Sequence, residues 1–227
     1  MLVEIWSDIA CPWCYVGKRR FEAALAAFEH RDRVRVTWRA FELDPGAPPE
    51  RPGDRTERLA RKYGVSLTEA QAMHDRMTEE GAREGVAFDF AGVRDGNTFD
   101  AHRLSHLAAA HGVQDAMEER LFRAHLSEGR LLSDHDTLRE LARDVGLPPA
   151  EVDELLAGDR FAAEVRTDER DAASAGITAV PFFAVDRSLG GAGAHPPEAL
   201  LDLLRRGWER RPRLAVADGP ACGPGGC

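Results

Sequence analysis

Two cysteines close to the N-terminus stand at a spacing that suits redox chemistry. Cys11 and Cys14 are separated only by Pro12 and Trp13. The residues before Cys11 have the pattern of a strand followed by a turn, so we expect Cys11 at the start of a helix. Pro12 would take the first helical position, where its missing N–H costs nothing. One turn of that helix brings the two thiols close enough to form a small disulfide ring.

The helix start also predicts different roles for the two thiols. Free backbone N–H groups and the positive end of the helix dipole stabilise a thiolate at Cys11. Such a position lowers a thiol pKa from about 8.5 into the range of about 3.5–7.5. We therefore expect Cys11 to be the exposed nucleophile and Cys14, deeper in the turn, to be the resolving thiol. Trp13, between them, is expected to offer substrate an apolar platform.

Zinc is the alternative ligand for this motif, because the same cysteine spacing is common in zinc sites. A four-thiolate site would pair Cys11 and Cys14 with Cys222 and Cys227. Pro12 directly after the first cysteine, the strand before it and the helix after it favour redox chemistry instead. We expect no metal, and a thiolate-zinc protein remains the less favoured hypothesis.

Cys222 and Cys227 form a second close pair near the C-terminus, around the residues Gly-Pro-Gly-Gly. Glycines impose little backbone strain, so an internal disulfide is sterically easy there. The pair is either a secondary redox couple that exchanges electrons with the first, or an inert chain end. The sequence supports both interpretations equally.

Asp8 and two histidines are further polar candidates. Asp8 lies three residues before Cys11 and could relay a proton during exchange, although a turn or capping role is favoured. His102 and His106 are spaced to share one face of a helix, which is a possible metal pair. No carboxylate motif accompanies them, so packing or surface positions are favoured.

The elements that position the first pair are predicted from hydrophobic periodicity. A strand over 2–6, a helix over 17–30 and a strand over 34–41 make a βαβ unit, which should be parallel and right-handed. A Pro- and Gly-rich stretch follows, then nearly continuous helical patterns. Two features in them are a capping box from Ser66 to Glu69 and a helix capped by Asn97.

Strand character returns at 178–185, and a last helix is predicted at 197–209. We therefore expect an α/β fold that is split by an inserted all-helical domain. The predicted limits are 1–52 for the first half of the α/β domain, 53–176 for the helical insertion, 177–212 for the second half and 213–227 for a mobile tail.

Composition excludes several functions. The net charge of −9 argues against a nucleic-acid binder, which normally has a basic face. No run approaches the roughly 18 consecutive apolar residues of a membrane span. The first residues lack the basic and long apolar regions of a secretory signal, so we expect a cytoplasmic protein with no membrane partner.

Four motifs together resemble the DsbA-like proteins of the FrnE group, over about residues 2–210. They are Ser7-Asp8-x-x-Cys11-Pro12-Trp13-Cys14, Asn97-Thr98-Phe99-Asp100-Ala101-His102-Arg103-Leu104, Gly176-Ile177-x-x-Val180-Pro181-Phe182-Phe183 and Gly193-Ala194-His195-Pro196-Pro197. The resemblance implies a thioredoxin fold with a helical insertion. It also implies an enzyme that performs dithiol–disulfide exchange on protein substrates or on small thiols such as glutathione, as oxidase, reductase or disulfide isomerase.

The resemblance implies further site residues. Pro181 should follow a cis peptide bond, a minority state for X–Pro bonds, and pack against the dithiol. The backbone of Val180 would then be free to pair with a substrate strand. Pro12 and Trp13 belong to the same substrate-binding surface, and His102 is a candidate for lining the cleft.

The same superfamily contains the runner-up function. It includes 2-hydroxychromene-2-carboxylate isomerases and kappa-class glutathione transferases, which have a serine at the position of Cys11. A glutathione-dependent isomerase or transferase of small aromatic substrates is therefore the alternative. The leading hypothesis requires no cofactor beyond the redox-active disulfide, with glutathione as a possible co-substrate.

Overall fold

The computed structural model describes residues 1–211 of the 227-residue chain. Cys222 and Cys227 lie outside the described residues, as does the whole of the predicted tail. The role of the second cysteine pair therefore stays a prediction.

A four-stranded mixed sheet has the strand order β2-β1-β3-β4. Its strands are β1 (Leu2–Ser7), β2 (Arg35–Ala40), β3 (Phe182–Val185) and β4 (Leu189–Ala192). β1 runs parallel to β2, which confirms the βαβ unit, and antiparallel to β3, which is antiparallel to β4. β3 begins only at Phe182, later than the predicted residue 178. Pro181 precedes it and has no N–H to donate to a strand ladder.

One face of the sheet carries the alternating apolar residues that the sequence predicted. Val3 and Ile5 of β1 lie beside Val36 and Trp38 of β2 in the parallel register. This face packs against α1 (Pro12–Ala27) and α9 (Pro197–Glu209), which also contact each other. Because side chains alternate along a strand, the remaining strand residues face the opposite side.

The opposite face is covered by α8 (Ala162–Ser174). Trp6 and Ala184 from the sheet form a small apolar cluster there with Ala172 of α8. The indole Nε1 of Trp6 donates a hydrogen bond of 3.0 Å to the carbonyl oxygen of Asp168. The central strands β1 and β3 are thus buried on both faces.

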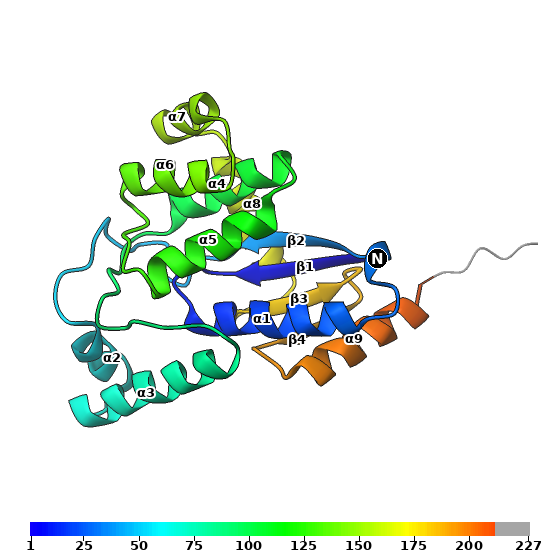
Figure 1. The fold of residues 1–227 in the computed structure, drawn as a ribbon, viewed down its shortest axis with the longest axis horizontal. Helices are drawn as coiled ribbons and strands as arrows, with labels where there is room; N and C mark the ends of the chain where they lie inside the picture. Colours follow the sequence, from blue (N-terminus) through cyan, green and yellow to red (C-terminus); the bar gives the residue numbers. More distant parts are fainter. Residues whose placement is uncertain (212–227) are drawn as a thin grey trace, which may run out of the picture.

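A short 3-10 turn, Arg31–Arg33, precedes β2. Between β2 and β3 the chain forms helices that are joined by loops. They are α2 (Arg55–Tyr63), α3 (Leu67–Arg83), α4 (Phe99–Ala110), α5 (Gln114–Leu126), α6 (His135–Asp144), α7 (Pro149–Ala157) and α8. In Figure 1, α4 to α8 stack on one side of the strands, and α2 and α3 lie apart from them, beside the start of α1. α8 contacts both α4 and β2, so helices and sheet meet in one packed body. The domain limits 1–52, 53–176 and 177–212 stay a prediction.

Two predicted helix starts can be compared with the structure. Ser66 and Glu69 form the capping box before α3, as predicted. The N-cap of α4 is Thr98, so the prediction for Asn97 was wrong by one residue. Asn97 still serves the helix start, since its side-chain oxygen accepts a 2.9 Å hydrogen bond from the N–H of Phe99. Among residues 1–211, none of the helices has the length and apolar character that crossing a membrane requires.

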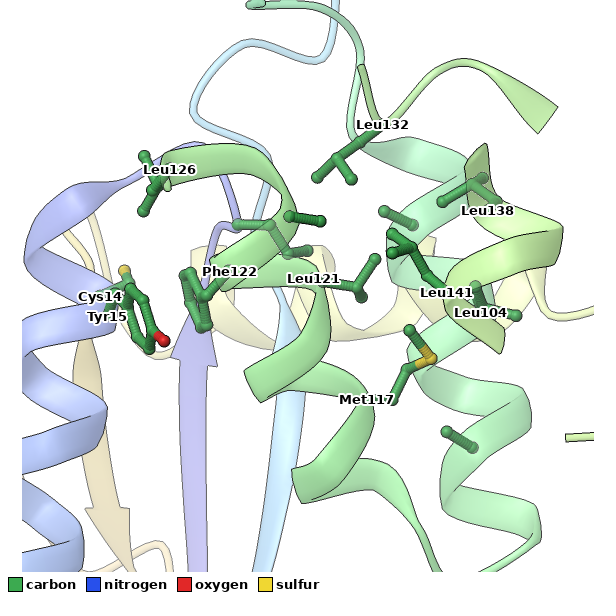
Figure 2. Close-up of a cluster of buried hydrophobic side chains, with 14 of the residues drawn as sticks. Cys14, Tyr15, Leu104, Met117, Leu121, Phe122, Leu126, Leu132, Leu138 and Leu141 are labelled. Atoms are coloured by element: carbon green, nitrogen blue, oxygen red, sulfur yellow. The ribbon is translucent and has the colours of Figure 1, made fainter. Parts of the chain in front are cut away.

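The largest apolar core joins the start of α1 to the helical layer. Figure 2 shows Cys14 and Tyr15 of α1 facing Phe122 and Leu126 of α5. The rings of Tyr15 and Phe122 stack with their centroids 5.1 Å apart. The first turn of α1 is therefore clamped between sheet and helices, which restricts how its cysteines can move.

Candidate active site

Cys11 is the N-cap of α1 and Pro12 is its first helical residue, as the sequence predicted. Both Cys11 and Cys14 are free thiols in this structure. Cys14 is 0 % exposed and Cys11 only 8 %. The order of exposure is the predicted one, but the expectation of an openly exposed Cys11 was wrong. Its Sγ lies 3.9 Å from the carbonyl oxygen of Val180, whose loop shields it.

The surroundings of the two thiols separate their acidities. The largest influence on Cys11 is the Cys14 thiol, which lowers its pKa. Burial and the negative charge of Asp8 oppose this effect, the N–H groups of Cys14 and Trp13 support it, and the pKa of Cys11 is lowered overall. Burial, together with the neighbouring Cys11, raises the pKa of Cys14 well above that of an ordinary thiol. Cys11 is thus the thiol that ionises first.

The loop before β3 packs directly against this turn. The Val180–Pro181 peptide bond is cis, which confirms that prediction. Gly17 of α1 makes the close approach possible, because a Cβ at this position would lie 2.7 Å from Cγ of Pro181. Among residues 1–211, the N–H and carbonyl of Val180 form no backbone hydrogen bond. These groups can therefore pair with an added extended segment.

Asp8 anchors the turn that leads into Cys11, and it is buried with 2 % exposure. Its carboxylate accepts hydrogen bonds from the N–H of Ala10 at 3.1 Å and of Leu43 at 2.7 Å. His102 of α4 places Nε2 3.6 Å from Asp8 Oδ1. Burial raises the pKa of Asp8, but His102 and the two N–H groups outweigh it and lower that pKa overall.

His102 is 3 % exposed and stands behind Asp8, not on an open cleft surface. Burial lowers the pKa of His102, but Asp8 outweighs it and raises that pKa overall. Burial also raises the pKa of Glu118, which accepts a 2.5 Å hydrogen bond from Ser105 and interacts with His102. Sequence reasoning missed Glu118, because nothing distinguishes this glutamate from the other acidic residues of α5.

His106 has a different partner from His102. Its Nε2 lies 2.9 Å from Oδ2 of Asp168 on α8. Among residues 1–211, no group of three or more His, Cys, Asp or Glu side chains is arranged to hold a metal ion. His102 and His106 thus face separate carboxylates, Asp8 and Asp168.

A pocket of about 750 Å³ opens beside the turn from Asp8 to Ala10. Its walls are the loop after β2, helix α2 and the segment before α4. Leu43 in its wall and Trp13 between the cysteines are among the large exposed apolar side chains, at 49 % and 45 %. Sequence reasoning missed this pocket. Its signal is the run of basic residues over 55–62 in a chain of net charge −9.

Comparison with known proteins identifies the family of this chain. The family model of the DsbA-like thioredoxin domain matches residues 2–205. This chain belongs to that family. Its thioredoxin fold and its membership of a family of thiol–disulfide oxidoreductases follow.

Individual relatives agree with the family assignment. The uncharacterized protein YwbO of Bacillus subtilis is 30 % identical over 185 residues, which cover 81 % of this chain and 86 % of YwbO. The structure of a probable DsbA oxidoreductase from Streptomyces coelicolor is 47 % identical, with a TM-score of 0.90 and coverage of 100 % of this chain and 98 % of that one. The cytosolic disulfide reductase DsbM of Pseudomonas aeruginosa shares the fold at 19 % identity, with a TM-score of 0.62 and coverage of 92 % and 99 %.

Proposed function

We propose that this protein is a thiol–disulfide oxidoreductase in which Cys11 and Cys14 form the redox couple. The observation that carries the proposal is geometric: Cys11 is the N-cap of α1, Cys14 is fully buried one turn further on, and the cis Val180–Pro181 bond lies beside Cys11. The attacking thiol of an exchange reaction must be a thiolate, and the resolving thiol has to remain in reserve until the mixed disulfide exists. The N-cap position of Cys11 serves the first requirement.

The exchange then runs in two balanced steps. The Cys11 thiolate attacks one sulfur of a substrate disulfide, so a Cys11–substrate bond forms while the other substrate sulfur leaves as a thiolate. Cys14 then loses its proton and attacks Sγ of Cys11. The second substrate sulfur departs as a thiolate, and an oxidised Cys11–Cys14 pair remains. In the reverse direction the same steps oxidise a substrate dithiol.

Asp8 and His102 are proposed to serve proton transfer at this couple. The lowered pKa of Asp8 keeps its carboxylate ionised, and its charge acts on the Cys11 thiol. Its lowered pKa makes the Asp8 carboxylate a weak base, so its proposed part is to pass the proton that Cys14 releases on to solvent and not to keep it. His102, 3.6 Å from Asp8, holds that carboxylate in place and balances its charge.

Substrate binding is proposed at the surface formed by Pro12, Trp13, Val180 and Pro181. An extended substrate segment would pair with the backbone N–H and carbonyl of Val180, whose carbonyl accepts only the long 3.9 Å contact from Cys11 Sγ, as strand addition does in other peptide-binding proteins. The half-exposed indole of Trp13 would pack against apolar parts of the same segment. Protein disulfides, protein thiols and small thiols such as glutathione are the substrates proposed.

Trapping experiments test the proposed couple. Cys14→Ser should still attack a disulfide but accumulate a mixed disulfide through Cys11, visible as an adduct by mass spectrometry. Cys11→Ser is the matched control and should form no adduct. Adducts on Cys14 in the Cys11→Ser variant would show that the two roles are reversed.

The alternative activity is the glutathione-dependent isomerisation or transfer of small aromatic molecules. A 2-hydroxychromene-2-carboxylate isomerase shares the fold at 13 % identity, with a TM-score of 0.64. Redox exchange is preferred because the structure places two free thiols one helical turn apart at the start of α1. Assays of disulfide exchange and of glutathione adduct formation, run side by side on the same preparation, separate the two activities.

A cytoplasmic location and a redox role for Cys222 and Cys227 are further parts of the proposal. DsbM, a protein of the same fold, is described as cytosolic and has also been solved with glutathione. Deleting residues 221–227 should slow turnover of a protein disulfide if the second pair exchanges with Cys11. Unchanged rates, with no trapped link from Cys11 to either tail cysteine, would remove that role.

A further inference from the structure

The pocket beside the Cys11 turn is cationic, in a protein whose net charge is −9. Five basic side chains and three carboxylates line it. The basic residues are Arg51, Arg55, Arg58, Arg61 and Lys62. An acidic protein repels anions over most of its surface. A cluster of basic side chains at one site therefore attracts anions to that site alone.

Helix α2 supplies most of this charge in a regular pattern. Arg55, Arg58 and Lys62 recur at intervals of three and four residues, which places them on one face of the helix. Leu59 lies on the same face, and it also lines the pocket. Helix α2 therefore presents a stripe of basic side chains, with Leu59 among them, to the pocket beside the Cys11 turn.

The carboxylates in the wall do not neutralise this stripe. Asp95 alone faces two guanidinium groups, since it pairs with Arg55 and accepts a 2.5 Å hydrogen bond from Arg58. Among residues 1–211, Arg61 and Lys62 form no ion pair. Burial lowers the pKa of Arg55 although Asp95 opposes it.

The pocket walls are pinned to each other by backbone contacts. The N–H of Arg51 donates to the carbonyl of Asp95 at 2.8 Å, and the N–H of Asn97 donates to that of Pro48 at 3.0 Å. A Cβ at Gly96 would lie 2.1 Å from the carbonyl oxygen of Pro49, so only glycine fits at this crossing. These contacts fix the loop after β2 against the segment before α4, and Asp95 of that segment holds Arg55 and Arg58 beside it before any substrate arrives.

We propose that this pocket binds a carboxylate-bearing arm of the substrate, so that the protein prefers disulfides with an acidic group close to the reacting sulfur. The inference rests on the proposed function, because it assumes that Cys11 attacks the substrate disulfide. A pocket volume of about 750 Å³ suits a small acidic thiol or two or three residues of an acidic peptide. Both ligands carry a carboxylate, which the basic stripe of α2 would hold.

A charge series of small disulfides tests the preference. The probes are 3,3′-dithiodipropionate, the neutral bis(2-hydroxyethyl) disulfide and the cationic cystamine, each reacted with the reduced protein to give a second-order rate constant. The dianion should react fastest after correction for its intrinsic rate with a small free thiol. Its advantage should shrink at high salt, since the Debye length falls from about 10 Å at 0.1 M to about 3 Å at 1 M.

Arg61→Gln with Lys62→Gln is the matching double variant. Both side chains are exposed and Gln is a good helix former, so α2 should persist. Loss of two exposed charges should make the dianion react roughly two- to thirtyfold more slowly while the neutral probe is unchanged. Arg33→Gln with Arg35→Gln is the control. It removes the same charge beside the start of β2, at the opposite end of the parallel strands from Cys11.

Peptide disulfides distinguish the two sources of the carboxylate. A glutamate next to the bridged cysteine should accelerate the reaction over a glutamine, and the acceleration should disappear in the α2 variant if peptides use the pocket. Equal slowing of the dianion in the α2 and control variants would overturn the inference, because only overall charge would then matter. Exchange with all three probes at equal corrected rates would overturn it too. No exchange with any probe would instead contradict the proposed function.

Discussion

At the Cys11 thiol, the Cys14 side chain lowers the pKa, whereas burial and the charge of Asp8 raise it. The rate of alkylation against pH in the wild type should therefore show an inflection below the usual thiol value of about 8.5. Asp8→Asn removes a negative charge beside the thiolate, so the inflection should move to lower pH. Asp32→Asn, at the exposed turn before β2, is the control and should leave it in place. An upward shift in Asp8→Asn would contradict the electrostatic account.

The Asp8–His102 pair makes stability depend on pH. The pKa of His102 is raised in the folded state, so its contribution is complete below the unfolded value of about 6.5 and is lost as pH rises through the folded value. The pKa of Asp8 is lowered, so its contribution is present above about 3.9 and is lost as pH falls through the folded value. The pairing is therefore strongest between about pH 4 and 6.5.

A double-mutant cycle measures that pairing. Urea unfolding of the wild type, Asp8→Asn, His102→Gln and the double variant should give a coupling of about 1–3 kcal/mol near pH 5.5. The coupling should shrink as pH rises through the raised folded pKa of His102, where the imidazole loses its charge. A coupling that stays constant over the whole pH series would mean that the charge of His102 does not carry the pairing.

At the scale of elements, α1 and the loop before β3 meet at Gly17 and Pro181. Gly17→Ala adds a methyl group 2.7 Å from Cγ of Pro181, so the loop must move away from the dithiol. Overpacking lowers the free energy of unfolding by about 1–3 kcal/mol, and the better helix propensity of alanine offsets up to about 1 kcal/mol of that loss. The free energy of unfolding should therefore fall, and the disulfide-exchange rate should fall with it.

Gly207→Ala is the control for this prediction. It creates a similar clash in α9, with a Cβ 2.3 Å from Cγ1 of Val185 at the other end of β3 from Pro181. This variant should also lose stability but should keep the exchange rate of the wild type. Loss of exchange in both variants would attribute the effect to general destabilisation instead of the position of Pro181.

At the scale of the whole molecule, Asp168 of α8 joins the sheet to the helical layer. Its carboxylate accepts a 2.9 Å hydrogen bond from Arg39 and a 3.0 Å hydrogen bond from the N–H of Ala40, both on β2. It also lies 2.9 Å from His106 on α4. Asp168→Asn should lower the free energy of unfolding by about 2–3 kcal/mol. This loss is smaller than for a fully buried ion pair, because Arg39, the partner of Asp168, is partly exposed.

Chemical unfolding monitored by tryptophan fluorescence tests this, since Trp6 of the sheet donates to the backbone of Asp168. Asp153→Asn on α7 removes an exposed aspartate whose partner is Arg139, and it should cost less than 1 kcal/mol. Equal losses in the two variants would mean that Asp168 does not connect the layers.

Local sequence patterns predicted much of the site and its framework. The strand–turn–helix order placed Cys11 at an N-cap, and the alternation of Val3 and Ile5 identified the buried face of β1. These features depend on residues close together in the chain, and periodicity reports such short-range preferences directly. The roles assigned to Cys11 and Cys14 remain predictions, although their surroundings favour them.

Tertiary structure alone decided which distant groups share an environment. Asp8 meets His102 of α4, and α8 covers one face of the sheet. The basic stripe of α2 is local in sequence, but its position beside Cys11 depends on how the loop after β2 packs on the segment before α4. Periodicity tells which face of a helix is buried but not what it is buried against, because that partner is chosen by packing across the whole chain.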